Sequence, residues 1–559
     1  MKVLEKFKNN KVSGDLLLPF GIFILAFLLR IVFINKVPVS LNWDETSFAY
    51  NAYSILKTGK DEYGNFMPLQ FKSVGDYKAP LFIYALVPFI KIFGLNLWSV
   101  RLLPSLTSSF SVVAFYFIVK VLTQRKVAFV SALMLCFSPW HLQFSRGGAD
   151  VGFATIFTTA GIAFFLYGNK KPKLYYLSAV FFSLSIYSYF GERLFVPLIF
   201  LWLLFVNRKQ LFERKKILLK IIFVILIFAL PIFSSLVSQG HQEKILKTTV
   251  FGYQRPGEYV TQVQKLSTSV LTYDLFHSSL AEGTFGFIDR YLTHFSPRFL
   301  FFFGPSEDPR QYIFDMGMLY LFDLPFIFLG LTSLGKLKKK NRMFTVGWLL
   351  LAPLPAAITR DPVHARRAFN MVYPLLMLSS LGFWESAAII KKQPVKLKKL
   401  LLVLAALVST YLLAFYFISY YIYTPKKNYK GPAGWQWGYQ EVVNKVTPLA
   451  AHYQKVVVDT TYQGPYIFFL FFQKYPPELY QPQARLIQAD PQSLGEGAGY
   501  DNYEFRPIYW PEDRYKSGHL FVGPPERVRP KDIDPNEARV VEQVLFPNGE
   551  VAWLIVEVY

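Results

Sequence analysis

Long apolar runs separated by short polar loops dominate the chain up to residue 423. Most runs are rich in Leu, Ile, Phe and Val and hold at most one charged residue. Because a helix of about 20 apolar residues crosses the hydrocarbon core of a bilayer, this pattern predicts a mainly α, polytopic membrane protein with about eleven spans. The runs lie at 16–35, 99–123, 127–144, 151–167, 174–190, 194–206, 220–236, 316–334, 343–357, 368–386 and 400–423.

Basic residues gather in alternate loops between these runs. The chain holds 60 Lys and Arg against 37 Asp and Glu, a formal net charge of +23. Cytoplasmic loops of membrane proteins collect Lys and Arg, so the pattern predicts a cytoplasmic N-terminus and cytoplasmic basic loops, and it argues against nucleic acid as the partner. The basic segments are Lys2–Lys11, Arg125-Lys126, Lys170–Lys173, Arg208–Lys220, Lys336–Arg342 and Lys391–Lys399.

The apolar segment 79–94 is predicted to lie on the outer membrane surface. If it crossed the bilayer, every later basic loop would move to the outside. Pro88 and Lys91 suit an interfacial or re-entrant helix better than a full span. The segment 294–304 receives the same interpretation. The first run follows several lysines and precedes no small-residue cleavage site, so it is predicted to be a retained signal-anchor.

The chain divides into two predicted domains. Residues 1–423 form the membrane domain, whose first outer loop spans 36–98, and residues 424–559 form a small extracytoplasmic α/β domain. This second part is nearly neutral, with 14 basic and 16 acidic residues. Its pattern predicts a helix at 438–452, a strand at 455–460, an apolar helix at 464–474, an irregular stretch at 475–539, and a terminal hairpin that turns at Asn548-Gly549.

Composition narrows the class further. Only 17% of the residues are charged and 53% are apolar, whereas soluble domains carry roughly 25% charged residues. The single cysteine, Cys136, excludes a disulfide framework and a cysteine-based zinc site. His141 has no second histidine at metal-ligand spacing. The sequence therefore predicts no required cofactor, and a divalent metal is not indicated.

Carboxylates gather in the first outer loop. Asp44 and Glu45 follow the first run closely, and Trp43 beside them is typical of a membrane interface. A carboxylate held at this boundary is a candidate general base. A solvated acidic loop is the alternative. Asp76 and Lys78 precede the interfacial segment, where the lysine is a candidate for neutralising a lipid phosphate or simply extends toward the membrane surface.

Further charged candidates lie in the later outer loops. Arg366, Arg367 and, behind them, His364 run against the positive-inside tendency and are candidates for a phosphate clamp. Lipid-headgroup contact or pairing with Asp361 is the alternative. Three residues in short outer turns are additional site candidates, with a structural ion pair between the first two left open: Arg146, Asp150 and Arg193.

The order of the first-loop motifs resembles a known family. The stretch NWDETSFAYNAYSILKTGKDEYGNFMPLQF is followed by GDYKAPLFIY and then by VRLLPSL. This order resembles the membrane glycosyltransferases of the GT-C fold, and most closely the group that contains protein O-mannosyltransferases and the lipid A aminoarabinose transferase. The resemblance is clearest over residues 16–200 and returns at 290–385.

The resemblance implies a reaction and a site. It implies transfer of a sugar from a polyprenyl-phosphate donor, usually with inversion, and without a required metal. Asp44 matches the family's essential carboxylate, with Glu45 beside it, and Lys78 matches a residue that holds the donor phosphate. Asp76 lies in the same motif, and Arg101 matches an arginine of unassigned role. A protein, lipid or polysaccharide acceptor and the identity of the sugar are left open.

Two other functions compete with sugar transfer. A transporter or flippase of lipid-linked saccharides is the main alternative, and an inactive scaffold whose tail binds a partner is the other. The chain shows no internal repeat of the kind that many transporters have, and its candidate charges cluster at one face. These features favour the transferase. For a prokaryotic chain with short loops, the predicted location is the plasma membrane.

Overall fold

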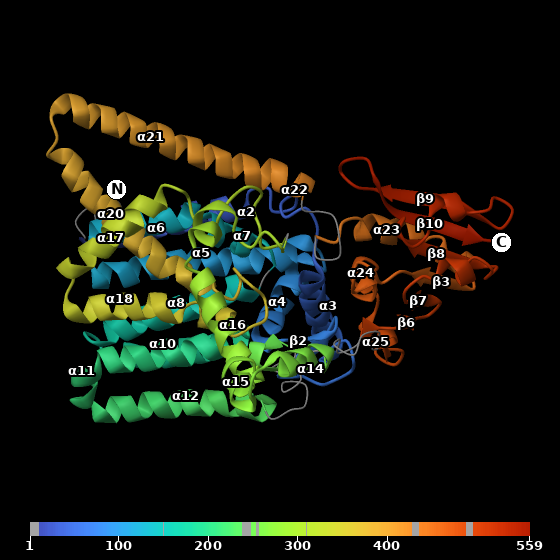
Figure 1. Ribbon diagram of the computed structural model, residues 1–559, viewed down its shortest axis with the longest axis horizontal. Coiled ribbons are helices and arrows are strands. Elements are labelled where there is room, and N and C mark those ends of the chain that lie inside the picture. The colour runs from blue at the N-terminus through green and yellow to red at the C-terminus, as the bar shows by residue number, and fades with distance from the viewer. Residues whose placement is uncertain are drawn as a thin grey trace, which may run out of the picture.

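The computed structural model describes residues 11–148, 150–236, 248–252, 257–308, 310–427, 435–487 and 496–559. A large helical bundle makes up most of the molecule, and a small mixed sheet with short helices stands at one end of it (Figure 1). The bundle contains most of the apolar runs of the sequence. The fold class predicted from the hydrophobic pattern, helical with a C-terminal α/β region, is therefore confirmed.

Every one of the predicted apolar runs contains a helix. These helices are α2 (Lys11–Ile31), α5 (Leu97–Leu122), α6 (Arg125–Phe137), α8 (Asp150–Gly168), α9 (Leu174–Ser188), α10 (Glu192–Val206), α12 (Lys215–Leu236), α17 (Asp323–Ser333), α18 (Lys339–Leu351), α20 (Val372–Lys391) and α21 (Val395–Ile418).

Fewer helical segments qualify as membrane spans than the sequence predicts. Within the described residues, 4 helical segments are long and apolar enough to cross a membrane, and a fifth is added if α6 and α7 (Pro139–Arg146), bent by 55°, count as one. The segments are Leu97–Leu122, Asp150–Gly168, Phe369–Lys391 and Val395–Tyr423. For the shorter helices, a full crossing stays a prediction.

The two ends of the bundle differ in their loops. The helix α11 (Arg208–Phe212) and the connection between α20 and α21 lie at one end, and both are basic (Figure 1). The helices α3 (Trp43–Thr58) and α4 (Pro80–Phe93) lie at the other end, next to the C-terminal sheet. The bundle thus separates these basic loops from the first loop, as the charge pattern predicts.

The two segments predicted to lie at the membrane surface are both short. The helix α4 has 14 residues, fewer than the roughly 20 that a span requires. The segment 294–304 contains a short π-helical turn, Arg298–Phe302. Between α12 and α17 lie further short helices: Val250–Gly252, α14 (Gly257–Leu266), α15 (Val270–Phe276) and α16 (Ser279–Thr293).

Short helical turns complete the connections. The remaining ones in the membrane part are Leu334–Lys336, α19 (Leu354–Ala357), Phe369–Met371, Ser419–Tyr423 and α22 (Thr424–Lys427). Those in the C-terminal part are Ala450–His452, α25 (Pro477–Tyr480), α26 (Trp510–Asp513) and Pro530–Asp532. Two small antiparallel pairs also occur, β1 (Phe71–Ser73) with β2 (Asp76–Lys78) and β4 (Leu486–Ile487) with β5 (Glu496–Gly497).

A six-stranded sheet forms the centre of the C-terminal part. Its strand order is β6-β7-β3-β8-β10-β9, with β3 parallel to both β7 and β8 and the other pairs antiparallel. The strands are β6 (Gly499–Tyr500), β7 (Tyr503–Phe505), β3 (Lys455–Val458), β8 (His519–Gly523), β10 (Val551–Val558) and β9 (Ala538–Leu545).

Most sequence predictions for this part are confirmed. The predicted helices correspond to α23 (Tyr439–Val446) and α24 (Pro465–Phe472), and the terminal hairpin turns at Gly549 with φ 88°. The irregular stretch predicted at 475–539 is wrong, because it contains β8, a strand at the middle of the sheet. Four of its five residues are buried, so this short strand lacks the alternation that marks a half-exposed strand.

The C-terminal part and the first loop share one apolar core. Phe48 and Phe82, from α3 and α4, belong to the same buried cluster as Phe468 of α24 and Trp553 of β10. The boundary at 423/424 therefore separates two stretches of sequence that fold against each other. As a result, the first loop is packed between the bundle and the C-terminal sheet.

Candidate active site

Asp44 is fixed by the way in which α3 begins. Asn42 caps the helix: its side chain accepts the backbone N–H of Glu45 at 3.0 Å, and the Glu45 side chain accepts the backbone N–H of Asn42 at 3.0 Å. This capping box satisfies two otherwise unpaired donors. Asp44 lies between the two capping residues, in the first helical turn, where the helix dipole favours negative charge.

Glu45 points away from Asp44 into the protein. Its carboxylate receives Arg101 Nε at 2.8 Å and Nη2 at 3.2 Å, together with the backbone N–H of Gly148 at 2.7 Å. Arg101 also donates to the carbonyls of Ile34 and Pro38, each at 2.9 Å. Both side chains are almost fully inaccessible to solvent. The structure therefore places Glu45 and Arg101 in a buried support beneath the first turn of α3.

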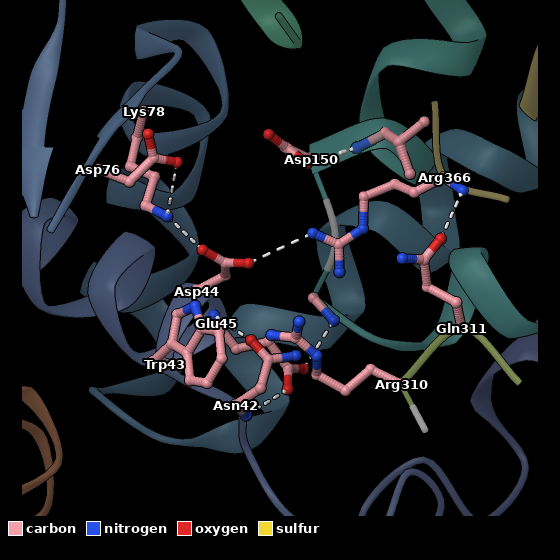
Figure 2. A network of polar contacts seen from close by, with 12 residues as sticks. Asn42, Trp43, Asp44, Glu45, Asp76, Lys78, Asp150, Arg310, Gln311 and Arg366 are labelled. Atoms are coloured by element: carbon pink, nitrogen blue, oxygen red, sulfur yellow. Dashed lines mark hydrogen bonds and ion pairs between the residues drawn. The ribbon is translucent and has the colours of Figure 1, made fainter. Parts of the chain in front are cut away.

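The Asp44 carboxylate lies between two cations (Figure 2). Lys78, at the end of the short β1–β2 hairpin, donates to one carboxylate oxygen, and Arg366 Nη1 lies 3.3 Å from the other. Lys78 Nζ also lies 3.6 Å from Asp76 Oδ2. These residues come from three separate parts of the chain, and the fold brings their charges to one point.

These charges control the protonation of Asp44. Burial alone would raise the pKa of its carboxyl, but the positive charges of Lys78 and Arg366, joined by Arg310, outweigh burial and hold the pKa below its usual range. For Lys78, burial alone would lower the pKa, and Asp44 and Asp76 raise it above the ordinary value. At neutral pH the pair is therefore a carboxylate and an ammonium ion.

A cavity of about 410 Å³ opens beside this pair. This volume falls within the range of small-molecule sites, roughly 300–1,000 Å³. Tyr189, Phe48 and Thr248 contribute to its wall. Eight residues predicted from the sequence also line it: Asp44, Asp76, Lys78, Asp150, Arg193, His364, Arg366 and Arg367.

Hydrogen bonds and an ion pair hold the loop that carries His364, Arg366 and Arg367. The Arg366 backbone N–H donates to Gln311 Oε1 at 3.0 Å, and Arg367 pairs with Asp361, as the sequence alternative proposed. The His364 N–H donates to His294 Nε2 at 3.1 Å. Burial, and next the charge of Arg367, lower the pKa of His364 well below its usual value. His364 is therefore neutral and contributes hydrogen bonding, not charge, to the cavity.

Three other predicted residues differ in their surroundings. Arg146 donates to the carbonyls of Leu29 and Arg30, each at 2.9 Å, and so anchors the end of α2. It is not among the residues that line the cavity. Arg193 lies on the cavity wall with its guanidinium 4.1 Å from the Phe190 ring centre. Asp150 begins α8 and lines the cavity. Their roles stay predictions.

Sequence reasoning missed Arg310. Its guanidinium lies 4.3 Å from the ring centre of Trp43 and 3.3 Å from Asp308, and its charge lowers the pKa of Asp44 (Figure 2). The signal that identified Arg366 applies here too, since Arg310 is a basic residue in a predicted outer loop. In the part of the chain that the structure describes, no group of three His, Cys, Asp or Glu side chains is placed to hold a metal ion.

A family model matches part of the chain. Residues 77–234 match the family model described as dolichyl-phosphate-mannose-protein mannosyltransferase. This range contains Lys78 and leaves Asp44 outside it. No curated protein matches the chain.

Solved structures share the fold over most of the chain. ArnT from Cupriavidus metallidurans bound to undecaprenyl phosphate has 11% identity and a TM-score of 0.56, with 98% of each chain covered. Its apo state gives 12% identity and a TM-score of 0.55, again with 98% of each chain covered. The archaeal oligosaccharyltransferase AglB from Archaeoglobus fulgidus, in complex with an inhibitory peptide and a dolichol-phosphate, has 13% identity and a TM-score of 0.51, covering 83% of this chain and 64% of its own. The chain thus has the fold of these proteins, and its predicted resemblance to GT-C glycosyltransferases is confirmed.

Proposed function

We propose that the chain is a glycosyltransferase that moves a sugar from a polyprenyl-phosphate donor to an acceptor hydroxyl. The observation that carries this proposal is the ionised Asp44 carboxylate, placed between Lys78 and Arg366 at a cavity of about 410 Å³. The family match and the two similar structures with bound polyprenyl phosphates support the donor class.

Asp44 is the proposed base. An acceptor hydroxyl has a pKa far above neutrality, so its proton must leave as the new glycosidic bond forms. Attack on the face opposite the leaving phosphate gives inversion at the anomeric carbon. The transition state carries positive charge on the sugar ring, and the negative carboxylate stabilises it. Glu45 supports the helix turn that holds Asp44 and is not itself a reacting group.

Cations take the leaving group. The lipid phosphate leaves as an anion, so its departure needs positive charge and no separate acid. Lys78 and Arg366 are the proposed partners, and Arg367 and Arg193 lie on the same cavity wall. A guanidinium can bind two phosphate oxygens at once. In this scheme the phosphate competes with Asp44 for Lys78 and Arg366, so donor binding frees the carboxylate for its role as base.

In the proposed topology the reaction takes place on the outer face of the plasma membrane. The first loop and the C-terminal part lie at one end of the bundle, and the basic loops lie at the other (Figure 1). Since cytoplasmic loops collect Lys and Arg, the site end is assigned to the outside. The proposed partners are a lipid-linked sugar and an acceptor protein, lipid or polysaccharide. No metal is required by this scheme.

The proposal is tested in cells that lack the chain. Deletion cells receive the wild type, Asp44→Asn, or the control Asp274→Asn, which removes the same charge from an exposed site outside the cavity. Mass spectrometry of proteins, lipids and polysaccharides identifies the lost glycan. Loss of a general base lowers the rate about 10²–10⁴-fold, so we expect only the wild type and the control to restore the product. Full restoration by Asp44→Asn would refute the assignment, and flipping without sugar transfer would favour the flippase.

A further inference from the structure

The hairpin that carries Lys78 contains a strained turn. Ser73 pairs with Asp76, so Val74 and Gly75 are the two central residues of the turn. Both have positive φ angles, 47° at Val74 and 63° at Gly75. Two-residue hairpins of this kind favour Asn or Gly at both positions. A β-branched residue rarely adopts such an angle, because its Cβ clashes with the backbone. Val74 therefore needs surrounding structure to hold it.

A residue of the C-terminal part holds the turn through a hydrogen bond. The backbone N–H of Val74 donates to the hydroxyl of Tyr466, in α24, at 2.9 Å. Tyr466 is completely buried. Gly464, just before α24, packs against the same turn, since a Cβ added there would come within 2.8 Å of Val74 Cγ1. Figure 1 shows α24 next to α3 and the first loop. The C-terminal part thus covers the turn closely.

The same hydroxyl reaches the helix that carries Asp44. Tyr466 donates to Glu62 Oε1 at 2.9 Å, and Asn51 of α3 donates to Glu62 Oε2 at 3.0 Å. The backbone N–H of Glu62 in turn donates to Asn51 Oδ1 at 3.1 Å. One tyrosine therefore connects the hairpin that carries Lys78 with the helix that carries Asp44.

We propose that Tyr466 is a positioning residue that holds the Val74-Gly75 turn in its left-handed conformation and thereby keeps Lys78 in contact with Asp44. The significance of this contact for catalysis rests on the proposed function. The geometric part does not, because the position of Lys78 can be measured without any substrate. A residue of the C-terminal part then positions Lys78 through the hairpin turn.

Amine labelling of Lys78 tests the geometry. In the wild type Lys78 is protonated, ion-paired and 5% exposed, so an acylating reagent should modify it slowly. Lys72, on the same hairpin, is partly exposed and serves as the internal reference. The full chain is purified in detergent, labelled briefly and analysed by mass spectrometry. Since a lost hydrogen bond is worth about 1 kcal/mol, Tyr466→Phe should raise the Lys78/Lys72 labelling ratio about fivefold.

Two further variants separate positioning from general destabilisation. Tyr503→Phe removes a hydroxyl that bonds Gln473 at 2.9 Å inside the C-terminal part, and it should leave the ratio unchanged. Val74→Gly relieves the strain in the turn, so adding it to Tyr466→Phe should bring the ratio back toward the wild type. If Tyr466→Phe does not fold, Gly464→Ala disturbs the same turn from the neighbouring position and should raise the ratio.

The outcomes separate this inference from the proposed function. An unchanged ratio in Tyr466→Phe overturns the inference, as does an equal rise in Tyr503→Phe or no return on adding Val74→Gly. Where donor turnover is measurable, Tyr466→Phe should raise the donor KM more than it lowers kcat. A changed ratio in a chain without transferase activity would support the positioning role and reject the reaction.

Discussion

At the scale of single residues, two neighbouring carboxylates have different surroundings. Successive helical residues point about 100° apart, so Asp44 and Glu45 cannot face the same surroundings. Asp44 faces the cavity, and Glu45 faces Arg101. Sequence spacing predicted the pair as a candidate site but could not separate its members, because the burial that distinguishes them depends on Arg101 and Gly148, both distant in sequence.

Replacing Lys78 should weaken donor binding first. If its ammonium ion binds the lipid phosphate, Lys78→Ala loses a charged hydrogen bond worth about 1.5–3 kcal/mol, which corresponds to a rise of roughly 10–100-fold in the donor KM. The acceptor KM should change less. Steady-state kinetics with each substrate varied in turn check this. Lys72→Ala, on the same hairpin but outside the cavity, is the control. An unchanged donor KM in Lys78→Ala would count against a phosphate role.

The same variant should shift the pH profile. A carboxylate with a lowered pKa stays ionised as the pH falls, and its activity as a base is lost only when the pH passes through that pKa. Removing the positive charge of Lys78 raises the pKa of Asp44 toward its ordinary value. The acid limb of kcat/KM in Lys78→Ala should therefore move to higher pH than in the wild type. An acid limb that stays in place would mean that a group other than Asp44 titrates.

At the scale of secondary-structure elements, α3 is the framework of the site. Its N-terminal turn is fixed by the Asn42 capping box, and the Glu45–Arg101 contact anchors that turn to α5. Lys78 enters from the β1–β2 hairpin, and Arg366 enters from the loop before α20. The site thus depends on the packing of three elements, not on one rigid helix.

Breaking the buried support should destabilise the fold. Arg101→Met leaves the Glu45 carboxylate buried without its cation, at a cost of about 3–5 kcal/mol. Thermal unfolding of the purified chain in detergent should show a clear fall in Tm. The exposed pair Arg539–Glu557 offers a matched control, because Arg539→Met changes the same residue types on the surface of the sheet and should barely alter Tm. Equal effects in both variants would contradict a special role for the buried pair.

The elements that sequence could predict are those with a local signal. An apolar run identifies a helix by itself, so each predicted run contains a helix. The helices α3 and α16 lie in predicted outer loops and were not predicted. The strand β8 was missed because its five residues are mostly buried and resemble any short apolar stretch. Arg310 was missed for a different reason. Its position in a predicted outer loop was a usable signal, but the contact with Trp43 that brings it to the site joins residues far apart in sequence.

At the scale of the whole molecule, the bundle keeps the basic connections apart from the first loop. The basic connections lie at one end, and the first loop and the C-terminal sheet lie at the other (Figure 1). Asp44 and Lys78 of the first loop line the cavity. The C-terminal part shares its core with the first loop, so both belong to the end that carries the site. Since cytoplasmic loops collect Lys and Arg, this arrangement predicts which end of the bundle lies outside the cell.

Sidedness can be tested with matched cysteine substitutions. Cys136 is the single native cysteine and is buried, so it should give little background. Lys60→Cys places a thiol on an exposed position of the first loop, and Lys338→Cys places one on an exposed position between α17 and α18. A membrane-impermeant maleimide should label the first variant in intact cells and the second only after lysis, because basic loops face the cytoplasm. The reverse pattern would put Asp44 and Lys78 on the cytoplasmic side. A lipid-linked sugar presented at the outer face could then not reach them, and the proposed reaction would have to be abandoned even if both residues proved essential.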